Sequence, residues 1–264
     1  MKLTSIAIVG AIAVLTVTPE VYAQTLPQTI APQNSAVTFL TQGLQKSDLG
    51  DLQGALADYT QAIRINPRYS LAYYNRGIVY QDLGETEAAL VDYGKAIEIN
   101  QNWGKGGLVD AYINRGLLRD QQGDRKGAIS DYDQAIHLNP RDSEAYYNRG
   151  IVYYNMGEKK AALVDYTKAI QVNKWTEKGP HSAYLNRGNV KAQLGDRKGA
   201  FEDYSKAINL KSDYALAYKN RGILYLGTGQ KTEGIQNLEK AADLFQQQGN
   251  FTQYEQVMQI LSQI

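Results

Sequence analysis

The chain has 264 residues, with 28 Lys and Arg against 27 Asp and Glu, so its formal net charge is +1 at pH 7. Because the two signs are also interleaved along the chain, the composition argues against a nucleic-acid-binding surface. There is no cysteine, which excludes disulfide bonds, thiolate metal sites, a cysteine nucleophile and a lipidated N-terminal cysteine.

The N-terminal segment has the organisation of a secretory signal. Lys2 supplies a positive charge, residues 6–17 form a short apolar run, and Val21 and Ala23 place small residues at the usual cleavage positions. We predict a signal peptide at 1–23, cleaved after Ala23, followed by a polar, disordered lead-in at 24–35. The alternative is an uncleaved membrane anchor, although the run is short for a spanning helix. Either reading takes the remainder of the chain out of the cytoplasm.

From residue 36 onward a unit of 34 residues recurs six times. Each copy shares a frame of Gly, Gly, Ala, Tyr and Ala, which in the second copy is Gly77, Gly84, Ala89, Tyr93 and Ala96. A fixed period of this length indicates a solenoid, in which every unit packs on its neighbours. We place the copies at 36–69, 70–103, 109–142, 143–176, 181–214 and 215–248.

Within each copy the apolar residues recur at helical spacing, which predicts two helices. In the second copy Leu71, Tyr74 and Ile78 belong to the first helix, and Leu90 and Tyr93 belong to the second. A glycine between the two can adopt the left-handed conformation that ends a helix. The Asp or Glu that usually follows suits the positive end of the next helix.

This pattern resembles the tetratricopeptide repeat (TPR) family, and the resemblance covers 36–248. It implies an all-α, right-handed superhelical solenoid of six helix–turn–helix repeats. The sixth copy departs from the frame, with Gly234 in place of Ala and Leu238 in place of Tyr. Residues 249–264 follow it and are predicted to form a capping helix, because an end repeat needs a soluble outer face. The close-copied repeats are similar to exported bacterial, often cyanobacterial, members of the family.

The array also contains a longer duplication, because residues 72–100 and 145–173 are identical at 21 of 29 positions. Each of these stretches is followed by a loop insertion, at 104–108 and at 177–180, and a tryptophan precedes each insertion: Trp103 and Trp175. Two interpretations remain open. The tryptophans pack over a widened joint between units, or they are anchors for a partner, since Trp is enriched at interface hot spots.

Arginine and aspartate recur at fixed positions of the first and second helix. The first copy has the Asp but Gln42 in place of Arg, and the sixth has the Arg but Asn237 in place of Asp. If each Asp pairs with the Arg of the next repeat, every recurring Asp and Arg has a partner. The planar guanidinium of Arg also suits a partly buried carboxylate. We therefore predict bridges that set the register between repeats rather than add net stability: Asp58–Arg76, Asp92–Arg115, Asp131–Arg149, Asp165–Arg187 and Asp203–Arg221.

The family resemblance implies that the first helices line a concave groove. One position there is Asn in five copies: Asn75, Asn114, Asn148, Asn186 and Asn220. Amides carry donors and an acceptor, so the row could hold the backbone of an extended peptide, as similar ladders do in the family. The alternative is that each Asn binds a neighbouring helix and orders the superhelix. Tyr74, Tyr147 and Lys219 are further candidate partner-binding residues, and Asp48, Asp82 and Asp120 add acid near one end.

These features predict a non-catalytic protein-binding scaffold or assembly factor in the periplasm, the thylakoid lumen or the cell exterior. The expected partner is an extended peptide segment or an amphipathic helix, with no nucleic acid and no membrane span after signal cleavage. The alternative function is a glycan or small-ligand binding protein of the periplasm. No catalytic residue, cofactor or metal site is expected, because the two histidines, His137 and His181, occupy non-equivalent places.

Overall fold

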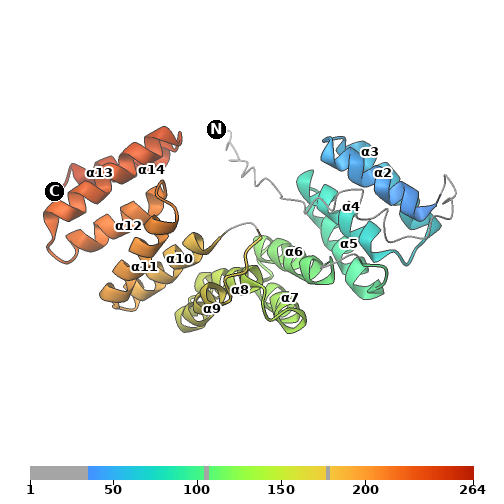
Figure 1. Cartoon of the computed structure of the whole chain (residues 1–264), viewed down its shortest axis with the longest axis horizontal. Coiled ribbons are helices and arrows are strands. Elements are labelled where there is room, and N and C mark those ends of the chain that lie inside the picture. The colour runs from blue at the N-terminus through green and yellow to red at the C-terminus, as the bar shows by residue number, and fades with distance from the viewer. Residues whose placement is uncertain (1–34, 104–106, 177–178) are drawn as a thin grey trace.

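The computed structural model describes residues 35–103, 107–176 and 179–264 (Figure 1). The predicted signal peptide and all but one residue of the predicted lead-in lie outside the described residues. The exception is Ser35, whose hydroxyl accepts a hydrogen bond from the backbone N–H of Thr38 and thereby caps the first described helix.

The described residues form thirteen helices and no strand, which confirms the predicted all-α fold. The helices are α2 (Ala36–Asp48), α3 (Leu52–Ile65), α4 (Ser70–Asp82), α5 (Thr86–Ile99), α6 (Gly107–Gln121), α7 (Arg125–Leu138), α8 (Ser143–Asn155), α9 (Lys159–Val172), α10 (Pro180–Gln193), α11 (Arg197–Leu210), α12 (Ala215–Leu226), α13 (Lys231–Gln247) and α14 (Phe251–Leu261).

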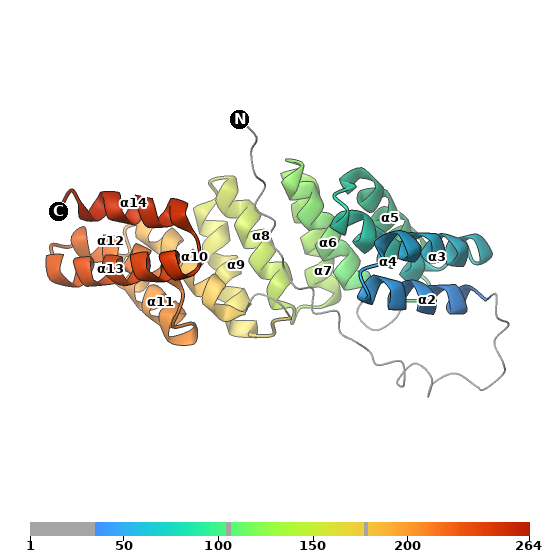
Figure 2. The same cartoon turned by 90° about the horizontal axis from the view of Figure 1, so that it is seen from above.

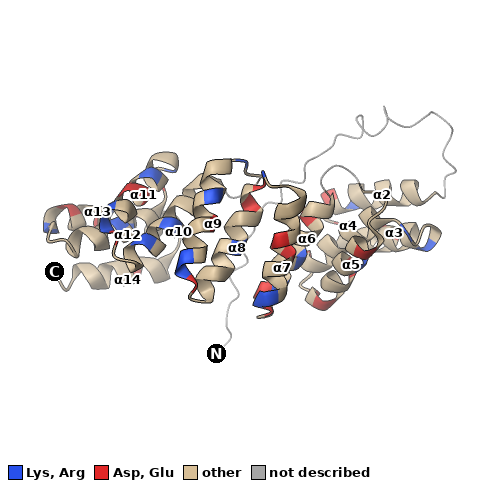
Figure 3. Ribbon diagram, turned by 90° about the horizontal axis from the view of Figure 1, so that it is seen from below, with Lys and Arg blue, Asp and Glu red and all other residues tan. Residues whose placement is uncertain are grey.

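Consecutive helices pack as pairs, and the pairs follow one another in a curved row (Figures 1 and 2). The first helices of the pairs are α2, α4, α6, α8, α10 and α12, and several contact the next first helix along the row as well as their own partner. We call the surface that they form the first-helix face, and the surface of α3, α5, α7, α9 and α11 the second-helix face. Both charge signs occur along the whole array (Figure 3).

The first five pairs are each held by a close contact between a glycine and a tyrosine, and in the sixth pair Gly222 meets Leu238 instead. In the second repeat Tyr93 of α5 is fully buried, and a Cβ atom added to Gly77 of α4 would lie 2.8 Å from its ring. The same arrangement recurs in the fourth repeat, where Tyr166 meets Gly150. Only glycine allows a helix to approach a large ring this closely, which explains the glycine at this position of the frame.

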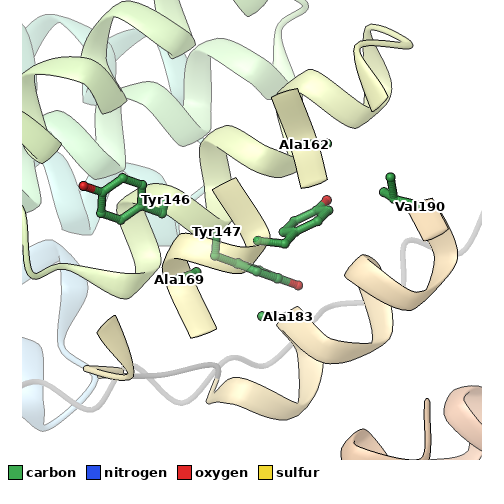
Figure 4. Packing of buried hydrophobic residues seen from close by; sticks show 7 residues of the cluster. Tyr146, Tyr147, Ala162, Ala169, Ala183 and Val190 are labelled. Carbon is green, nitrogen blue, oxygen red and sulfur yellow. The ribbon is translucent and has the colours of Figure 1, made fainter. Parts of the chain in front are cut away.

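Small residues fill the remaining space between repeats. Figure 4 shows Tyr147 of α8 among Ala162 and Ala169 of α9 and Ala183 of α10, and all four are buried. Alanines bury little area each, but they let large rings from neighbouring helices interdigitate at native packing density. Stability is therefore distributed over the contacts between adjacent helices, as expected of a solenoid.

The last helix, α14, covers the end of the sixth repeat. Its Val257 is fully buried, and Tyr254, Ile260 and Leu261 pack against the cluster formed by α13, as the sequence pattern predicts. Its outer face is less polar than expected, because Phe251 is 61% exposed. Among the described residues, no helix combines the length and apolar character needed to cross a membrane.

Candidate functional site: the first-helix face

The recurring Arg–Asp pairs beneath the first-helix face are formed within repeats, and the ion pair between repeats that occurs among the described residues joins Arg149 to Asp133, not to Asp131. Nε of Arg76 donates to Oδ2 of Asp92 at 2.7 Å and its Nη2 donates to Oδ1 at 2.9 Å. The same two-pronged contact joins Arg115 to Asp131, Arg149 to Asp165, and Arg187 to Asp203. The predicted pairs Asp58–Arg76, Asp92–Arg115, Asp131–Arg149, Asp165–Arg187 and Asp203–Arg221 are therefore wrong.

The error has a physical reason at each end of the array. Other side chains take the missing roles there: Lys46 lies 2.7 Å from Asp58, and Nε of Arg221 donates to the amide oxygen of Asn237 at 2.9 Å. Pairing within repeats thus leaves every member with a polar partner, and the partner of Arg221 is a neutral amide. The arginine does reach the preceding repeat, but through a different residue, as when Nη1 of Arg76 donates to the hydroxyl of Thr60 at 3.1 Å.

The asparagine row lies on the first-helix face, and three of its amides bind the preceding first helix. Nδ2 of Asn114 donates to the hydroxyl of Tyr74 at 3.3 Å, and Nδ2 of Asn186 donates to the hydroxyl of Tyr147 at 3.1 Å. Nδ2 of Asn220 donates to Oδ1 of Asn189 at 2.8 Å. These contacts favour a role in ordering the superhelix.

The row nevertheless has spare capacity for a ligand. A primary amide has two N–H donors and a carbonyl acceptor with two lone pairs. The bonds of Asn114 to Tyr74 and Tyr93, and of Asn186 to Tyr147 and Tyr166, therefore do not exhaust either amide. Asn75, Asn114, Asn186 and Asn220 are partly exposed, whereas Asn148 is only 6% exposed. A ligand on this face would therefore meet four amides, and Asn148 would contribute mainly to packing.

The other candidate residues on this face are partly committed to the fold. Tyr147 is 6% exposed, and burial raises the pKa of its hydroxyl to about 12. Nζ of Lys219 donates to the amide of Gln253 in α14 at 2.7 Å, and burial lowers the pKa of this lysine. Lys219 thus ties α12 to the capping helix, which is a role that the sequence did not predict.

The acidic residues near one end of the face lie beside the buried tyrosines of the same repeats. Burial raises the pKa of Tyr59, Tyr93 and Tyr132, and the charges of Asp48, Asp82 and Asp120 respectively add to this effect. These carboxylates place acid at this end of the face, as the sequence predicts, and Asp120 also lies 3.8 Å from Nε of Arg125.

Trp103 and Trp175 pack on the first-helix face instead of projecting into solvent. The ring of Trp103 lies edge-on to Tyr74 at 6.1 Å between centroids, and the ring of Trp175 lies edge-on to Tyr147 at 5.9 Å. Both are half-buried. These contacts favour the interpretation that each Trp covers the joint between two repeats, while part of each ring stays accessible.

A set of polar contacts that the sequence did not predict holds each tryptophan in place. Asn100 ends α5 in the left-handed conformation with φ 46°, and its Oδ1 accepts a hydrogen bond from Nε1 of Trp103 at 2.9 Å. Asn173 does the same for Trp175, with φ 51° and a distance of 3.2 Å. We call these arrangements the Trp103 step and the Trp175 step, each formed by the tryptophan, its asparagine and the tyrosine beneath.

A cavity of about 280 Å³ adjoins the Trp103 step. It lies at the N-terminal ends of α2 and α4, and its apolar walls come from Val37, Tyr69, Leu71 and Trp103. Val37 is 41% exposed, so the cavity is open to a ligand. An apolar side chain of a partner could be buried there.

Together these observations define a helical-repeat solenoid with an amide-bearing, partly aromatic face on its first helices. Models of the tetratricopeptide repeat match the chain at 43–84, 116–157 and 188–229 and at 70–102 and 143–174, so more than half of the chain is matched. The chain belongs to the tetratricopeptide repeat family.

Solved structures of other proteins share this fold. The chain is 17% identical to pilF of Pseudomonas aeruginosa, with a TM-score of 0.68, covering 84% of this chain and 96% of that one. It is 23% identical to a tetratricopeptide repeat protein from Parabacteroides merdae, with a TM-score of 0.63 and coverage of 83% and 87%. It is 24% identical to YrrB, described as a TPR protein with an unusual peptide-binding site, with a TM-score of 0.57 and coverage of 70% and 91%. No match was found among curated proteins.

Proposed function

We propose that this chain is a non-catalytic scaffold or assembly factor that holds a segment of a partner protein on its first-helix face. The observation that carries the proposal is the asparagine row, which continues over consecutive first helices with four partly exposed amides. Amides at repeat spacing can bind the backbone of an extended chain, whose own N–H and C=O groups recur regularly. The peptide-binding site that is described for YrrB is consistent with this use of the fold.

The chemistry of the face indicates the kind of segment that it suits. The acidic residues Asp48, Asp82 and Asp120 at one end of the face favour an uncharged or basic segment over an acidic one. The cavity beside Trp103 offers an apolar site of about 280 Å³. An extended segment or a helix with an apolar side fits this combination. The buried position of Tyr147 leaves little of the polar–aromatic cleft that a glycan would require.

We further propose that the chain works outside the cytoplasm, in the periplasm, the thylakoid lumen or the cell exterior. The support is the sequence of residues 1–23, which has a charged start, an apolar run and small residues at the cleavage positions. Mass spectrometry of the chain recovered from fractions of its host tests this. Export predicts an N-terminus at Gln24 in the exported fraction, and a chain that starts at Met1 in the cytoplasm would contradict it.

The binding proposal is tested by affinity capture with the exported chain and a variant that carries Asn75→Ala, Asn114→Ala and Asn186→Ala. Asn148 is left intact because truncating a buried amide would disturb the fold. Circular dichroism first checks that both proteins unfold at similar temperatures. Partners that the variant loses support the first-helix face, and an unchanged set of partners would contradict it.

A further inference from the structure

A second cavity lies at the edge of the array where first helices end and second helices begin. It measures about 340 Å³ and is formed between the start of α11 and the end of α12, so we call it the α11–α12 pocket. Its apolar walls are Phe201, Leu224 and Tyr225, and the rings of Phe201 and Tyr225 meet edge-on at 5.0 Å between centroids. Arg197 and Lys198 line the same pocket, and both are exposed.

The joint between the third and fourth repeats is the counterpart of this site, 72 residues earlier in the chain. Its helices α7, α8 and α9 begin 72 residues before α11, α12 and α13 respectively. Its bases Arg125 and Lys126 correspond to Arg197 and Lys198. A comparison of the two joints therefore shows which charges the later joint keeps and which it lacks.

The later joint keeps the bases but lacks four carboxylates. The shift of 72 residues takes Asp120 to Ala192, Asp133 to Ser205, Glu158 to Gln230 and Asp165 to Asn237. Three of these acids pair with a base at the earlier joint, because Asp120 lies 3.8 Å from Nε of Arg125 and both Asp133 and Asp165 bind Arg149. The pocket at the later joint is consequently more positive than its counterpart.

Charge changes in the opposite direction lie outside the lining of the pocket. Glu202 and Glu233 replace neutral residues of the earlier joint, and Thr232 replaces Lys160. None of these positions lines the pocket, whose lining contains two bases and no acid. The local excess of positive charge therefore remains.

One consequence is a partly buried cation without a carboxylate. Nε of Arg221 donates to the amide oxygen of Asn237 at 2.9 Å, and its Nη1 donates to the hydroxyl of Ser205 at 3.1 Å. Within the described part of the chain, Arg221 forms no ion pair. Its guanidinium carbon lies 5.9 Å from the ring centroid of Phe201, which lines the pocket. Burial accordingly lowers the pKa of Arg221.

The bases at the rim are also available to a ligand. Neither Arg197 nor Lys198 forms an ion pair with a described residue. Asp196 precedes them and caps α11, but its counterpart caps α7, so this charge is common to both joints. The amide oxygen of Gln230 accepts a hydrogen bond from the hydroxyl of Thr228 at 3.2 Å, which leaves the N–H donors of this amide for an anion.

We propose that the α11–α12 pocket is a second binding site, which takes an acidic segment of a partner protein with an apolar side chain next to its Asp or Glu. The apolar side chain packs against Phe201, Leu224 and Tyr225, and the carboxylate binds the exposed bases, since a guanidinium offers two parallel donors to a carboxylate. The site uses none of the row's asparagines, so it is independent of the proposed function. It also differs in charge preference from the first-helix face.

The test is a selection of randomised displayed peptides on the purified chain, followed by affinity measurements with labelled synthetic peptides of the selected sequences. We expect one class of selected peptides to carry Asp or Glu next to an aromatic or large aliphatic residue. Replacing this acid by Gln or Asn should weaken binding to the wild type by roughly tenfold, and more at low salt than at high salt.

A matched variant comes from the chain itself. Ser205→Asp, Gln230→Glu and Asn237→Asp install at the later joint three carboxylates of the earlier one. Two of them would pair with Arg221 as their counterparts pair with Arg149, so the variant should remain folded, which circular dichroism checks. Its affinity for the acidic peptides should fall by roughly tenfold or more.

A control variant adds the same negative charge far from the pocket. Gln45→Glu, Gln53→Glu and Gln101→Glu replace exposed residues of the first two repeats. This variant should bind the acidic peptides within about twofold of the wild type, because distant sites act independently. Equal weakening in the matched variant and the control would show a general charge effect and would overturn the assignment.

The remaining outcomes separate this site from the first-helix face. Acidic peptides that bind the matched variant as tightly as the wild type overturn the pocket, as does a selection without acidic peptides. If every selected peptide is instead lost in the Asn75→Ala/Asn114→Ala/Asn186→Ala variant, the pocket is overturned and the proposed function stands. Failure to select any peptide on the folded wild type overturns both. Peptides lost only in the matched variant support the pocket whether or not the first-helix face binds.

Discussion

The pairing of arginine and aspartate within repeats makes a prediction that distinguishes it sharply from pairing between repeats. Asp92 is 3% exposed, and both of its oxygens accept hydrogen bonds from Arg76, at 2.7 and 2.9 Å. Replacing Arg76 by Met leaves a buried carboxylate without its cation, which costs about 3–5 kcal/mol. Replacing both residues, as Arg76→Met with Asp92→Leu, removes the buried charge and should recover most of that loss.

The assay is a double-mutant cycle in urea unfolding, with the free energy of unfolding measured for the wild type, both single variants and the double variant. We expect a coupling of about 2–3 kcal/mol between Arg76 and Asp92 and less than about 0.5 kcal/mol between Arg115 and Asp92. Because solenoids need not unfold in one step, the cycle is read from probes of the second repeat. Coupling of Asp92 to Arg115 as large as its coupling to Arg76 would refute the reasoning.

Three further predictions follow from the same contacts. Gly150→Ala places a Cβ 2.8 Å from the ring of Tyr166 and should destabilise the fold by about 1–3 kcal/mol. Gly94→Ala, whose Cβ would lie 3.7 Å from the nearest atom, should be neutral or stabilising by up to about 1 kcal/mol. Thermal unfolding compares the two variants, and equal effects on stability would contradict the packing account. Asn100→Ala should destabilise the fold by about 1 kcal/mol because Asn100 has φ 46°, and Asn100→Gly should cost less; the reverse order in urea unfolding would contradict this. Burial raises the pKa of Asp142, so the folded state binds its proton more tightly than the unfolded state, and the charged carboxylate costs stability above the folded pKa. Asp142→Asn, which can still cap the helix, should therefore raise the melting temperature more at pH 7 than at about pH 3, below the unfolded pKa; an equal gain at both pH values would contradict it.

Much of the fold could be predicted from the sequence because the repeat makes each local pattern appear several times. The spacing of Gly77, Ala89 and Tyr93 predicts helix pairing, and the inward residues of α14, such as Val257, are apparent from periodicity alone. Counting the recurring Arg and Asp residues could not predict which aspartate pairs with each arginine. Once Lys46 and Asn237 serve as substitutes, pairing within repeats also gives every recurring Arg and Asp a polar partner, so only the distance between helices decides.

The candidate site was predictable in position but not in its contacts. Spacing assigns the asparagine row to the first helices, and the family resemblance implies that these helices share one face, yet the bond from Asn114 to Tyr74 depends on how closely successive first helices approach. The left-handed Asn100 and its bond to Trp103 were also missed. A signal existed, because Asn100 and Asn173 are repeated in the duplication just ahead of the tryptophans, but a loop conformation does not follow from helical periodicity.

The central claim, that partners bind the first-helix face, is tested most directly by photo-crosslinking in the native host. A benzophenone side chain is placed at Asn75 on the first-helix face or at Val91, which is 70% exposed on α5 of the same repeat. The account predicts that partner proteins crosslink to position 75 and that none of these partners crosslinks to position 91. Crosslinks from position 91 alone would contradict it and would assign binding to the second-helix face.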